Sequence, residues 1–442
     1  MINMDKRFLR THEARKIYEE IKDLPIIDYH CHLNPKDIAD DYAYENIGEL
    51  WLSHDHYKWR AMRICGVDEK YITGDASWRE KFMKYAEIMP KLAGNSLYYW
   101  SHLELEKLFG ITEHMSKDTA EKIWNECEKH KDELTARQII KRFPVKFVAT
   151  TDDPVDSLEY HGEYEGILFT PTFRPDKAFE LDDEYYARLS EVSRIEIKDV
   201  NTLIAALEKR LEFFISHSCR ISDQCFSVTP ILSDYDTAQS IFEKRNEAVS
   251  EEESRKFKGY VFSRLAEIYA KNGIVMQVHL NVKRNINKKM FENIGVDSGF
   301  DIAGSELYPR CLTEIFSFLD YSGNLPKTVI YSLNPYDERM LCQVAGSFRN
   351  VKVGAPWWHN DCYSGIRGHF ENVSEYSALG CDLGMLTDSR NLAGYVRFDF
   401  YRRILADYLG ELVSEEKLSL DCALDIAKGI AYGNVVEFLN LK

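Results

Sequence analysis

The chain has 442 residues, of which 45% are apolar and 29% are charged, a balance typical of a soluble globular protein. Its net charge of −16 argues against binding to nucleic acid or to an anionic membrane. No apolar run is long enough to span a bilayer, and the first ten residues lack the continuous apolar core of a signal peptide. The ten cysteines are scattered and include no Cys-x-x-Cys pair. We therefore expect reduced thiols and a cytoplasmic protein.

The N-terminal part of the chain predicts a helix, a short strand and then a long helical segment. Thr11 is a candidate N-cap, and apolar residues at helical spacing follow it until Pro25. Residues 25–29 predict a short buried strand. From about residue 35 to 143 the chain is rich in Trp, Tyr and helical periodicity. We interpret this stretch as a helical subdomain inserted after the first strand.

Beyond this insertion, short apolar or β-branched runs alternate with helical segments. The runs cover residues 145–150, 167–172, 217–222, 274–279, 328–333, 351–355 and 383–387. With the first strand they make eight, which predicts an α/β fold of the (β/α)8 TIM-barrel type. Because no low-complexity linker divides the chain, we expect residues 1–442 to form a single elaborated barrel domain. An open doubly wound sheet is disfavoured, since no Gly-x-Gly-x-x-Gly follows any strand.

A His-x-His pair, His30 and His32, stands where the first predicted strand ends. Residues i and i+2 of an extended backbone point the same way, so the two imidazoles make two corners of a metal site. The intervening Cys31 points to the opposite side and is expected to be a core thiol. On its own, a His-x-His pair is a weak signal.

A carboxylate after the eighth predicted strand can complete this site. In a closed barrel the eighth strand lies beside the first, which brings Asp388 close to His30 and His32. Three protein ligands leave one position open, an arrangement typical of a catalytic metal. Nitrogen and oxygen donors without thiolate favour zinc as the divalent metal, with manganese, iron and cobalt as alternatives.

Polar or aromatic residues also follow the other predicted strands, where the chemistry of such barrels gathers. They are Asp152, Asp153, Arg174, Asp223, His279, Asn334, Trp357 and Arg390. Each has a purely structural alternative: Asp152 and Asp153 as helix N-caps, Arg174 as a surface arginine, Trp357 as a core residue. Their convergence on one rim is what points to a site.

Several of these positions lie in longer motifs that resemble the uronate (glucuronate) isomerases of the amidohydrolase superfamily. The motifs are Asp28-Tyr-His-Cys-His-Leu, Asp55-His-Tyr-Lys-Trp-Arg, Arg174-Pro-Asp-Lys, Trp357-Trp and Met385-Leu-Thr-Asp-Ser-Arg. The resemblance runs from about residue 6 to the C-terminus. It implies a metal-dependent barrel that interconverts D-glucuronate with D-fructuronate, and D-galacturonate with D-tagaturonate. It also implies metal binding by His30, His32 and Asp388, and active-site roles for Tyr57, Arg174, Asp223, His279, Trp357 and Arg390.

Aldose–ketose isomerisation moves a proton from C2 to C1 through an enediol, so it needs a base and a proton relay. We assign Asp388 as the base and Tyr57 as the relay, although Tyr57 has an alternative as a buried aromatic residue. His279 is a fourth metal ligand or, as we favour, a substrate contact. Arg174 or Arg390 grips the substrate carboxylate, with Arg174 preferred. Trp357 supplies an apolar wall against the sugar.

Two departures from the family pattern fall near strands four and five. After His279 the family shows Gly-Ala-x-Arg-Asn-Asn, whereas this chain reads Leu280-Asn-Val-Lys-Arg-Asn. Gln224 and Cys225 follow Asp223, where a His-Gly pair is common. The metal set is intact, so any change in substrate preference is expected around these two strands.

Two other functions compete with the isomerase. A metal-dependent hydrolase of the same superfamily often carries a bridging Lys or Glu at strand four and a further His at strand six. This chain has Asp223 and Asn334 there, which disfavours a two-metal hydrolase. A non-catalytic binding protein is disfavoured because the metal and arginine positions are present. We expect a small-molecule hexuronate as the only partner class, and a homo-oligomer.

Overall fold

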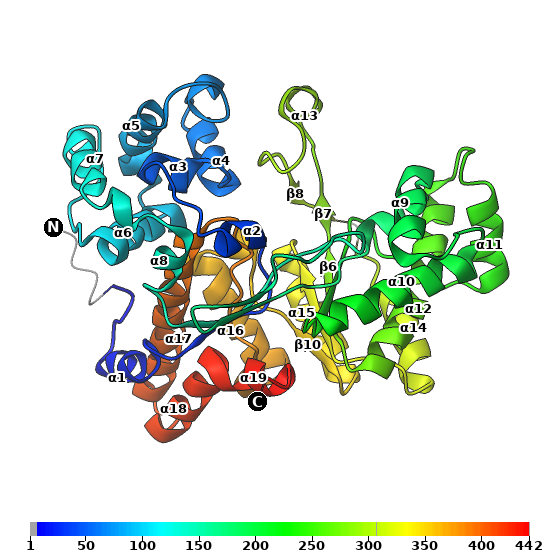
Figure 1. The fold of residues 1–442 in the computed structure, drawn as a ribbon. Helices are drawn as coiled ribbons and strands as arrows, with labels where there is room; N and C mark the ends of the chain where they lie inside the picture. Colours follow the sequence, from blue (N-terminus) through cyan, green and yellow to red (C-terminus); the bar gives the residue numbers. More distant parts are fainter. Residues whose placement is uncertain (1–6, 306, 442) are drawn as a thin grey trace.

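The computed structural model describes residues 7–305 and 307–441. Six of the first ten residues, in which a signal peptide was not expected, therefore lie outside the described part. Parallel strands lie at its centre with helices around them (Figure 1). One sheet has the order β1, β2, β4, β3, and the other has the order β10, β9, β6, β5. The strands are β1 (Ile26–Asp28), β2 (Val145–Ala149), β3 (Gly162–Tyr164), β4 (Ile167–Thr170), β5 (Ile221–Phe226), β6 (Val275–Leu280), β9 (Thr328–Ser332) and β10 (Val351–Val353). All pairings are parallel except that of β3 with β4.

Phe173 joins the two sheets. It forms parallel bridges with Asp152 on one side and with Ser222 on the other. Its N–H donates to the Ile221 carbonyl at 3.0 Å, and its carbonyl accepts from Asp223 N–H at 2.9 Å. The parallel order therefore continues from β1 to β10, as expected for the predicted α/β fold.

The segment predicted as the eighth strand runs beside β1 without forming a regular strand. Asp388 N–H donates to the His30 carbonyl at 3.0 Å, and His32 N–H donates to the Ser389 carbonyl at 2.9 Å. Upstream, the Asp28 carboxylate accepts the Thr387 N–H and hydroxyl at 2.8 and 2.6 Å, taking the place of a backbone partner. Within the described residues no strand pairing connects residues 383–387 to β10. The eighth segment therefore lies beside β1, as predicted, and backbone and side-chain hydrogen bonds join the two.

The fourth predicted strand was placed too early. Helix α10 (Val200–Ser216) runs to the position where residues 217–222 were expected to begin a strand, and β5 starts only at Ile221. Ser218 adopts a left-handed conformation with φ of 68°, which separates the helix from the strand. As a result Asp223 lies inside β5, with its side chain fully buried, and not after a strand end.

Helices occupy the segment between β1 and β2, as predicted. They are α2 (Pro35–Ala39), α3 (Ile47–Leu52), α4 (His56–Ile64), α5 (Trp78–Ile88), α6 (Ser96–Phe109), α7 (Ala120–Glu128) and α8 (Ala136–Ile140). Helix α4 begins after Asp55, whose carboxylate accepts from the backbone N–H groups of Tyr57 and Lys58 at 3.0 and 3.1 Å. This cap fixes the start of the helix that carries His56 and Tyr57.

The remaining α-helices cover the outside of the strands (Figure 1). They are α1 (His12–Ile21), α9 (Asp183–Ser193), α11 (Tyr235–Glu243), α12 (Glu251–Asn272), α14 (Pro309–Tyr321), α15 (Glu338–Ser347), α16 (Tyr363–Tyr376), α17 (Val396–Ser414), α18 (Leu420–Lys428) and α19 (Asn434–Phe438). In the part of the chain that the structure describes, none of the helices has the length and apolar character needed to cross a membrane.

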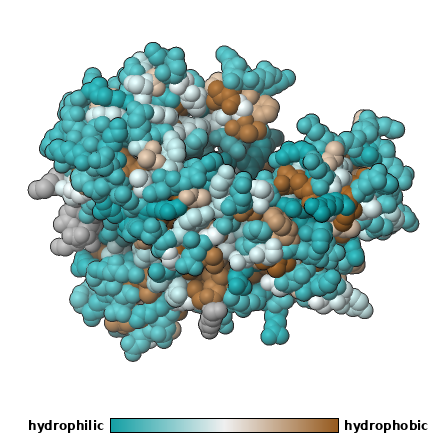
Figure 2. Space-filling model, viewed as in Figure 1, coloured by the Kyte–Doolittle hydropathy of each residue, from teal (hydrophilic) through white to brown (hydrophobic). Residues whose placement is uncertain are grey.

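A hairpin after β6 was not predicted. Strands β7 (Val282–Lys283) and β8 (Ile302–Ala303) pair antiparallel, and α13 (Lys288–Ile294) lies between them. It stands apart from the barrel strands and faces the helical insertion (Figure 1). Arg60 of α4 donates to the Gly299 carbonyl at 3.1 Å, so the hairpin is anchored to the insertion. Figure 2 shows a mostly hydrophilic surface with a hydrophobic patch at the hairpin, where Ile286, Phe291 and Val296 are exposed.

A buried charged group ties α15 and α16 to the loop before the eighth segment. His369 of α16 is fully buried, with Nδ1 2.5 Å from Glu338 Oε1 and Nε2 2.8 Å from Asp382 Oδ2. Burial alone would lower the pKa of this imidazole, but the two carboxylates raise it from 6.5 to about 10. His369 is therefore a cation held between two anions.

We predict that His369→Gln lowers the free energy of unfolding by about 3 kcal/mol near pH 6, because the variant leaves the buried Asp382 and the partly buried Glu338 carboxylates without their cation. The folded-state pKa is raised, so the stabilisation is full below the unfolded value of 6.5 and is lost as the pH rises through about 10. Urea unfolding of both proteins across this range measures the difference. A wild-type advantage that stays constant up to about pH 10 would contradict the charged pairing.

Candidate active site

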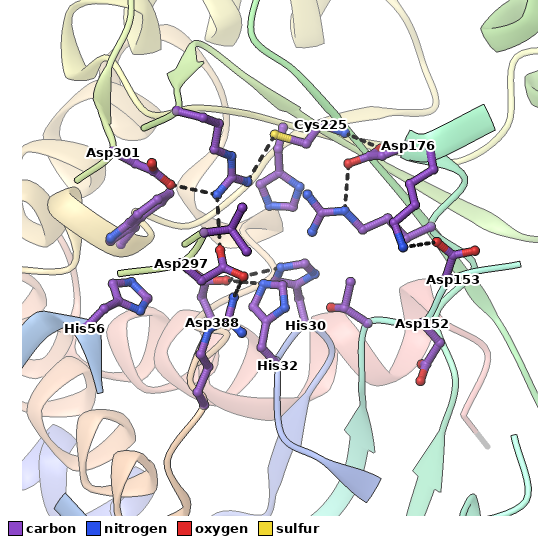
Figure 3. Close-up of a pocket in the computed structure, with 18 of the residues that line it drawn as sticks. His30, His32, His56, Asp152, Asp153, Asp176, Cys225, Asp297, Asp301 and Asp388 are labelled. Carbon is purple, nitrogen blue, oxygen red and sulfur yellow. Dashed lines mark hydrogen bonds and ion pairs between the residues drawn. The ribbon is translucent and has the colours of Figure 1, made fainter. Parts of the chain in front are cut away.

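A cleft of about 770 Å³ lies at the carboxyl ends of the parallel strands. Figure 3 shows its lining residues converging from the barrel, the helical insertion and the hairpin. Seven of the predicted site residues line it: His30, His32, Arg174, His279, Trp357, Asp388 and Arg390. The ends of the parallel strands thus bring residues from distant parts of the sequence into one cleft.

His30, His32 and Asp388 point toward one another in this cleft (Figure 3). Asp388 Oδ1 lies 3.3 Å from His30 Nε2 and 3.1 Å from His32 Nε2. His30 is buried, whereas the His32 side chain is 23% exposed toward the cleft. Asp388 has a φ of 47°, a left-handed conformation that is uncommon for a residue with a side chain and often marks a functional position.

The donor atoms of these three residues fit a divalent metal ion. One ligand atom from each lies within 4.8 Å of the others. Tetrahedral bonds of about 2.0–2.1 Å would separate two ligands by about 3.3 Å, close to the observed spacing. Burial would raise the pKa of Asp388, but hydrogen bonds from His30 and His32 hold it well below its ordinary value, so the group is a carboxylate. The predicted metal ligands are therefore correctly arranged around a common point.

His279 is oriented by Asp223. Its Nδ1 lies 2.6 Å from Asp223 Oδ1, and its ring stacks on Tyr331 with centroids 4.4 Å apart. Its Nε2 is buried without a hydrogen-bond partner among the described residues, and the ring edge contacts Trp357. This nitrogen is thus available for a substrate or a metal. His30, Asp223 and His279 also place one donor atom each within 4.8 Å of one another, so the fourth-ligand alternative remains geometrically open.

The predicted arginines lie among carboxylates. Arg174 NH1 is 3.1 Å from Asp223 Oδ2, and its Nε is 2.8 Å from Asp176 Oδ2. Arg390 NH2 is 3.1 Å from Asp297 Oδ2 in the hairpin. Burial would raise the pKa of Asp223, but Arg174, His279 and His30 hold it far below its ordinary range. Asp223 therefore orients a histidine and an arginine from beneath the cleft.

Tyr57 lies behind the cleft wall. Its ring stacks on that of His56, which lines the cleft, with centroids 4.9 Å apart. The Tyr57 hydroxyl is buried and has no hydrogen-bond partner among the described residues. Burial and the nearby Asp388 charge raise its pKa well above the ordinary value, while Arg397 acts in the opposite direction. The phenol is close enough to Asp388 to respond to its charge.

Sequence reasoning missed the residues that the hairpin brings to the cleft. Arg284, Asn285, Asp297 and Asp301 all line it. Arg284 NH1 lies 2.9 Å from Asp301 Oδ2, and Asn285 N–H donates to Asp301 Oδ1 at 2.7 Å. Arg284 and Asn285 fall in the segment that departs from the family pattern after His279, and this polar pair was the signal that could have identified them.

Three minor expectations have different outcomes. Cys31 is fully buried, as expected for a core thiol. Asp152 and Asp153 line the cleft, and no described helix begins at Pro154, so they are not N-caps of such a helix. Asn334 accepts from Tyr336 N–H and caps a short 3-10 helix; it is not among the cleft residues.

Comparison with known proteins agrees with this geometry. Residues 1–439 match the family model described as glucuronate isomerase. Curated uronate isomerases from Clostridium perfringens (strain 13) and Endomicrobium trichonymphae are 39% and 40% identical; the alignments cover 98% of both chains in the first case and 99% in the second. The crystal structure of uronate isomerase from Thermotoga maritima has a TM-score of 0.95 at 32% identity, covering 99% of this chain and all of that one. The chain therefore belongs to the glucuronate (uronate) isomerase family.

Proposed function

We propose that this protein is a uronate isomerase, which interconverts D-glucuronate with D-fructuronate and D-galacturonate with D-tagaturonate. The observation that carries the proposal is the cluster of His30, His32 and Asp388, set in a cleft that also holds Arg174 and Arg390. Membership of the glucuronate isomerase family supports it. The two arginines in the same cleft favour a sugar acid as substrate, and therefore isomerisation over two-metal hydrolysis.

The first chemical step is removal of the C2 proton, which we assign to Asp388. Both imidazoles contact its Oδ1, so we assign proton transfer to Oδ2. A divalent ion held by His30, His32 and Asp388, which we propose to be zinc with manganese, iron or cobalt as alternatives, would polarise the substrate oxygens and acidify their protons. His30 and His32 also fix the Asp388 carboxylate in one orientation toward the cleft.

Tyr57 and His279 complete the proposed proton transfers. We assign Tyr57 as the relay between O1 and O2, because its buried hydroxyl has no hydrogen-bond partner among the described residues and the Asp388 charge raises its pKa. His279 presents Nε2 to a sugar hydroxyl, since its Nδ1 is bound to Asp223. Trp357, which is almost fully buried beside His279, supplies an apolar wall that keeps water from the enediol.

The substrate carboxylate must be held by arginine side chains, because the chain as a whole carries a net charge of −16. We propose Arg174 as the principal contact and Arg390 as the second. The Arg390 Nε is buried without a hydrogen-bond partner among the described residues. Arg174 is already fixed by Asp176 and Asp223, so its fork is held in place before substrate arrives.

We also propose that residues 1–442 form one domain in the cytoplasm. The N-terminal helix α1 packs on the C-terminal α17, where the Tyr18 hydroxyl donates to Asp399 and Arg10 pairs with Asp407. The cytoplasmic location rests on the scattered cysteines, several of which are buried thiols.

His30→Ala and His32→Ala are expected to lose bound metal and isomerase activity together, because each variant removes one of three ligands. Elemental analysis and a D-glucuronate assay on the same sample measure both. His130→Ala is the matched control, since His130 lies in the helical insertion and is not among the cleft residues. Metal content and rate that survived the double replacement would refute the ligand assignment.

Asp388→Asn keeps the shape of the side chain but removes the proton acceptor. Its kcat should fall by about three orders of magnitude or more, measured per bound metal ion so that weakened metal binding is counted separately. Near-normal turnover in metal-loaded protein would move the base to another residue, with His279 the next candidate.

Arg174→Lys preserves the charge but loses the two-pronged fork. We expect KM for D-glucuronate to rise by the equivalent of about 2 kcal/mol of binding, with no gain for D-glucose. Arg310→Lys is the control, because the Arg310 side chain is 89% exposed and is not among the cleft residues. Equal wild-type rates on the two sugars, or an unchanged KM, would show that Arg174 does not select uronates.

A further inference from the structure

Arg397 of α17 is a buried cation directly behind the cleft. The residue is 3% exposed. Its guanidinium carbon lies 4.6 Å from the Tyr57 ring centroid and 4.4 Å from that of Trp100. Burial of a charge is costly unless the charge is paired. The Asp361 carboxylate, 3.6 Å from NH1, is the partner. Burying this ion pair still costs desolvation free energy, and the pair lies next to Tyr57, a proposed catalytic group. A role for Arg397 beyond packing would explain this position.

The same guanidinium is bound to the segment that carries Asp388. Arg397 NH1 donates to the carbonyl of Thr387 at 2.9 Å. Thr387 is itself held on its other side by the Asp28 carboxylate. The peptide that precedes Asp388 is therefore fixed from two directions, and this constraint supports the left-handed backbone of Asp388.

The face of the Tyr57 ring rests against this cation. Its hydroxyl has no hydrogen-bond partner among the described residues, so no hydrogen bond to them holds the phenol in place. Its position is set instead by contacts of the ring with Arg397, Trp100 and His56. The charge of Arg397 also opposes the rise in the Tyr57 pKa that burial and Asp388 cause.

We propose that Arg397 is a positioning residue that holds the Tyr57 phenol and the Asp388 carboxylate in one fixed arrangement for proton transfer. The proposal rests on the proposed isomerase function. Lysine cannot replace Arg397, because a planar guanidinium can contact two rings while it donates to a carbonyl in a fixed direction. A displacement of about 1 Å in such an arrangement is enough to slow a reaction about 100-fold.

The first test compares Arg397→Lys with Arg402→Lys. Arg402 lies in the same helix and is equally buried, but it donates to the carbonyls of Lys22 and Pro25, away from the cleft. Arg397→Lys should lower kcat about 100-fold, with KM within about threefold and metal content unchanged. Arg402→Lys should lower the melting temperature and leave kcat per folded chain unchanged. A fall in kcat that merely follows loss of metal-containing folded protein would overturn the proposal.

The second test is a double-mutant cycle with Tyr57→Phe. If Arg397 acts through Tyr57, the variant with both changes should be at most about threefold slower than the slower single variant. Rate losses that multiply, or a Tyr57→Phe variant with wild-type kcat, would overturn the proposal. Wild-type protein that forms no ketose from D-glucuronate would instead refute the proposed function itself.

Discussion

The contact of two imidazoles with one oxygen of Asp388 is the constraint on which the rest of the site depends. His30 and His32 follow the first strand, whereas Asp388 comes near the end of the chain. Backbone hydrogen bonds from Asp388 to His30, and from His32 to Ser389, hold the two segments together. The three side chains therefore come together only when the first strand and the eighth segment have met, so the proposed metal site forms together with the fold.

The cleft around this contact is crowded with charges that are paired with one another. Arg174 contacts Asp176 and Asp223, Arg390 contacts Asp297, and Arg284 contacts Asp301. This pairing keeps the arginines ordered in a protein whose overall field repels anions. The hairpin contributes Asp297 to one of these pairs and both Arg284 and Asp301 to another. The departure from the family pattern after His279 therefore falls in a segment that takes part in the charge pairs of the cleft.

The parallel strands and the metal ligands could be predicted because their signals are local. Apolar runs that alternate with helical segments indicated the strands. Because residues i and i+2 of an extended backbone point the same way, the spacing of His30 and His32 indicated a shared site. The hairpin was missed because β7 and β8 are two residues each and leave almost no periodicity. The eighth segment departs from a strand because the Asp28 side chain takes the hydrogen bonds of Thr387, a contact between residues far apart in sequence.

The positions of Tyr57 and Arg397 could not be read from the sequence for the same reason. Tyr57 belongs to the inserted helix α4 and Arg397 to α17, and only the folded chain places the guanidinium on the phenol ring. A motif identifies which residue types are present, whereas burial and charge neighbours decide what each can do. The local sequence thus predicts that His30, His32 and Asp388 lie together, and it does not predict the groups that surround Tyr57.

The most direct test of the central claim is a metal titration of the purified, metal-stripped protein, with D-glucuronate as substrate and D-fructuronate formation followed by NMR. A mononuclear site built from His30, His32 and Asp388 predicts no turnover without metal and full activity at one zinc ion per chain. Full activity in the stripped protein, or activity that appears only at two ions per chain, would contradict it.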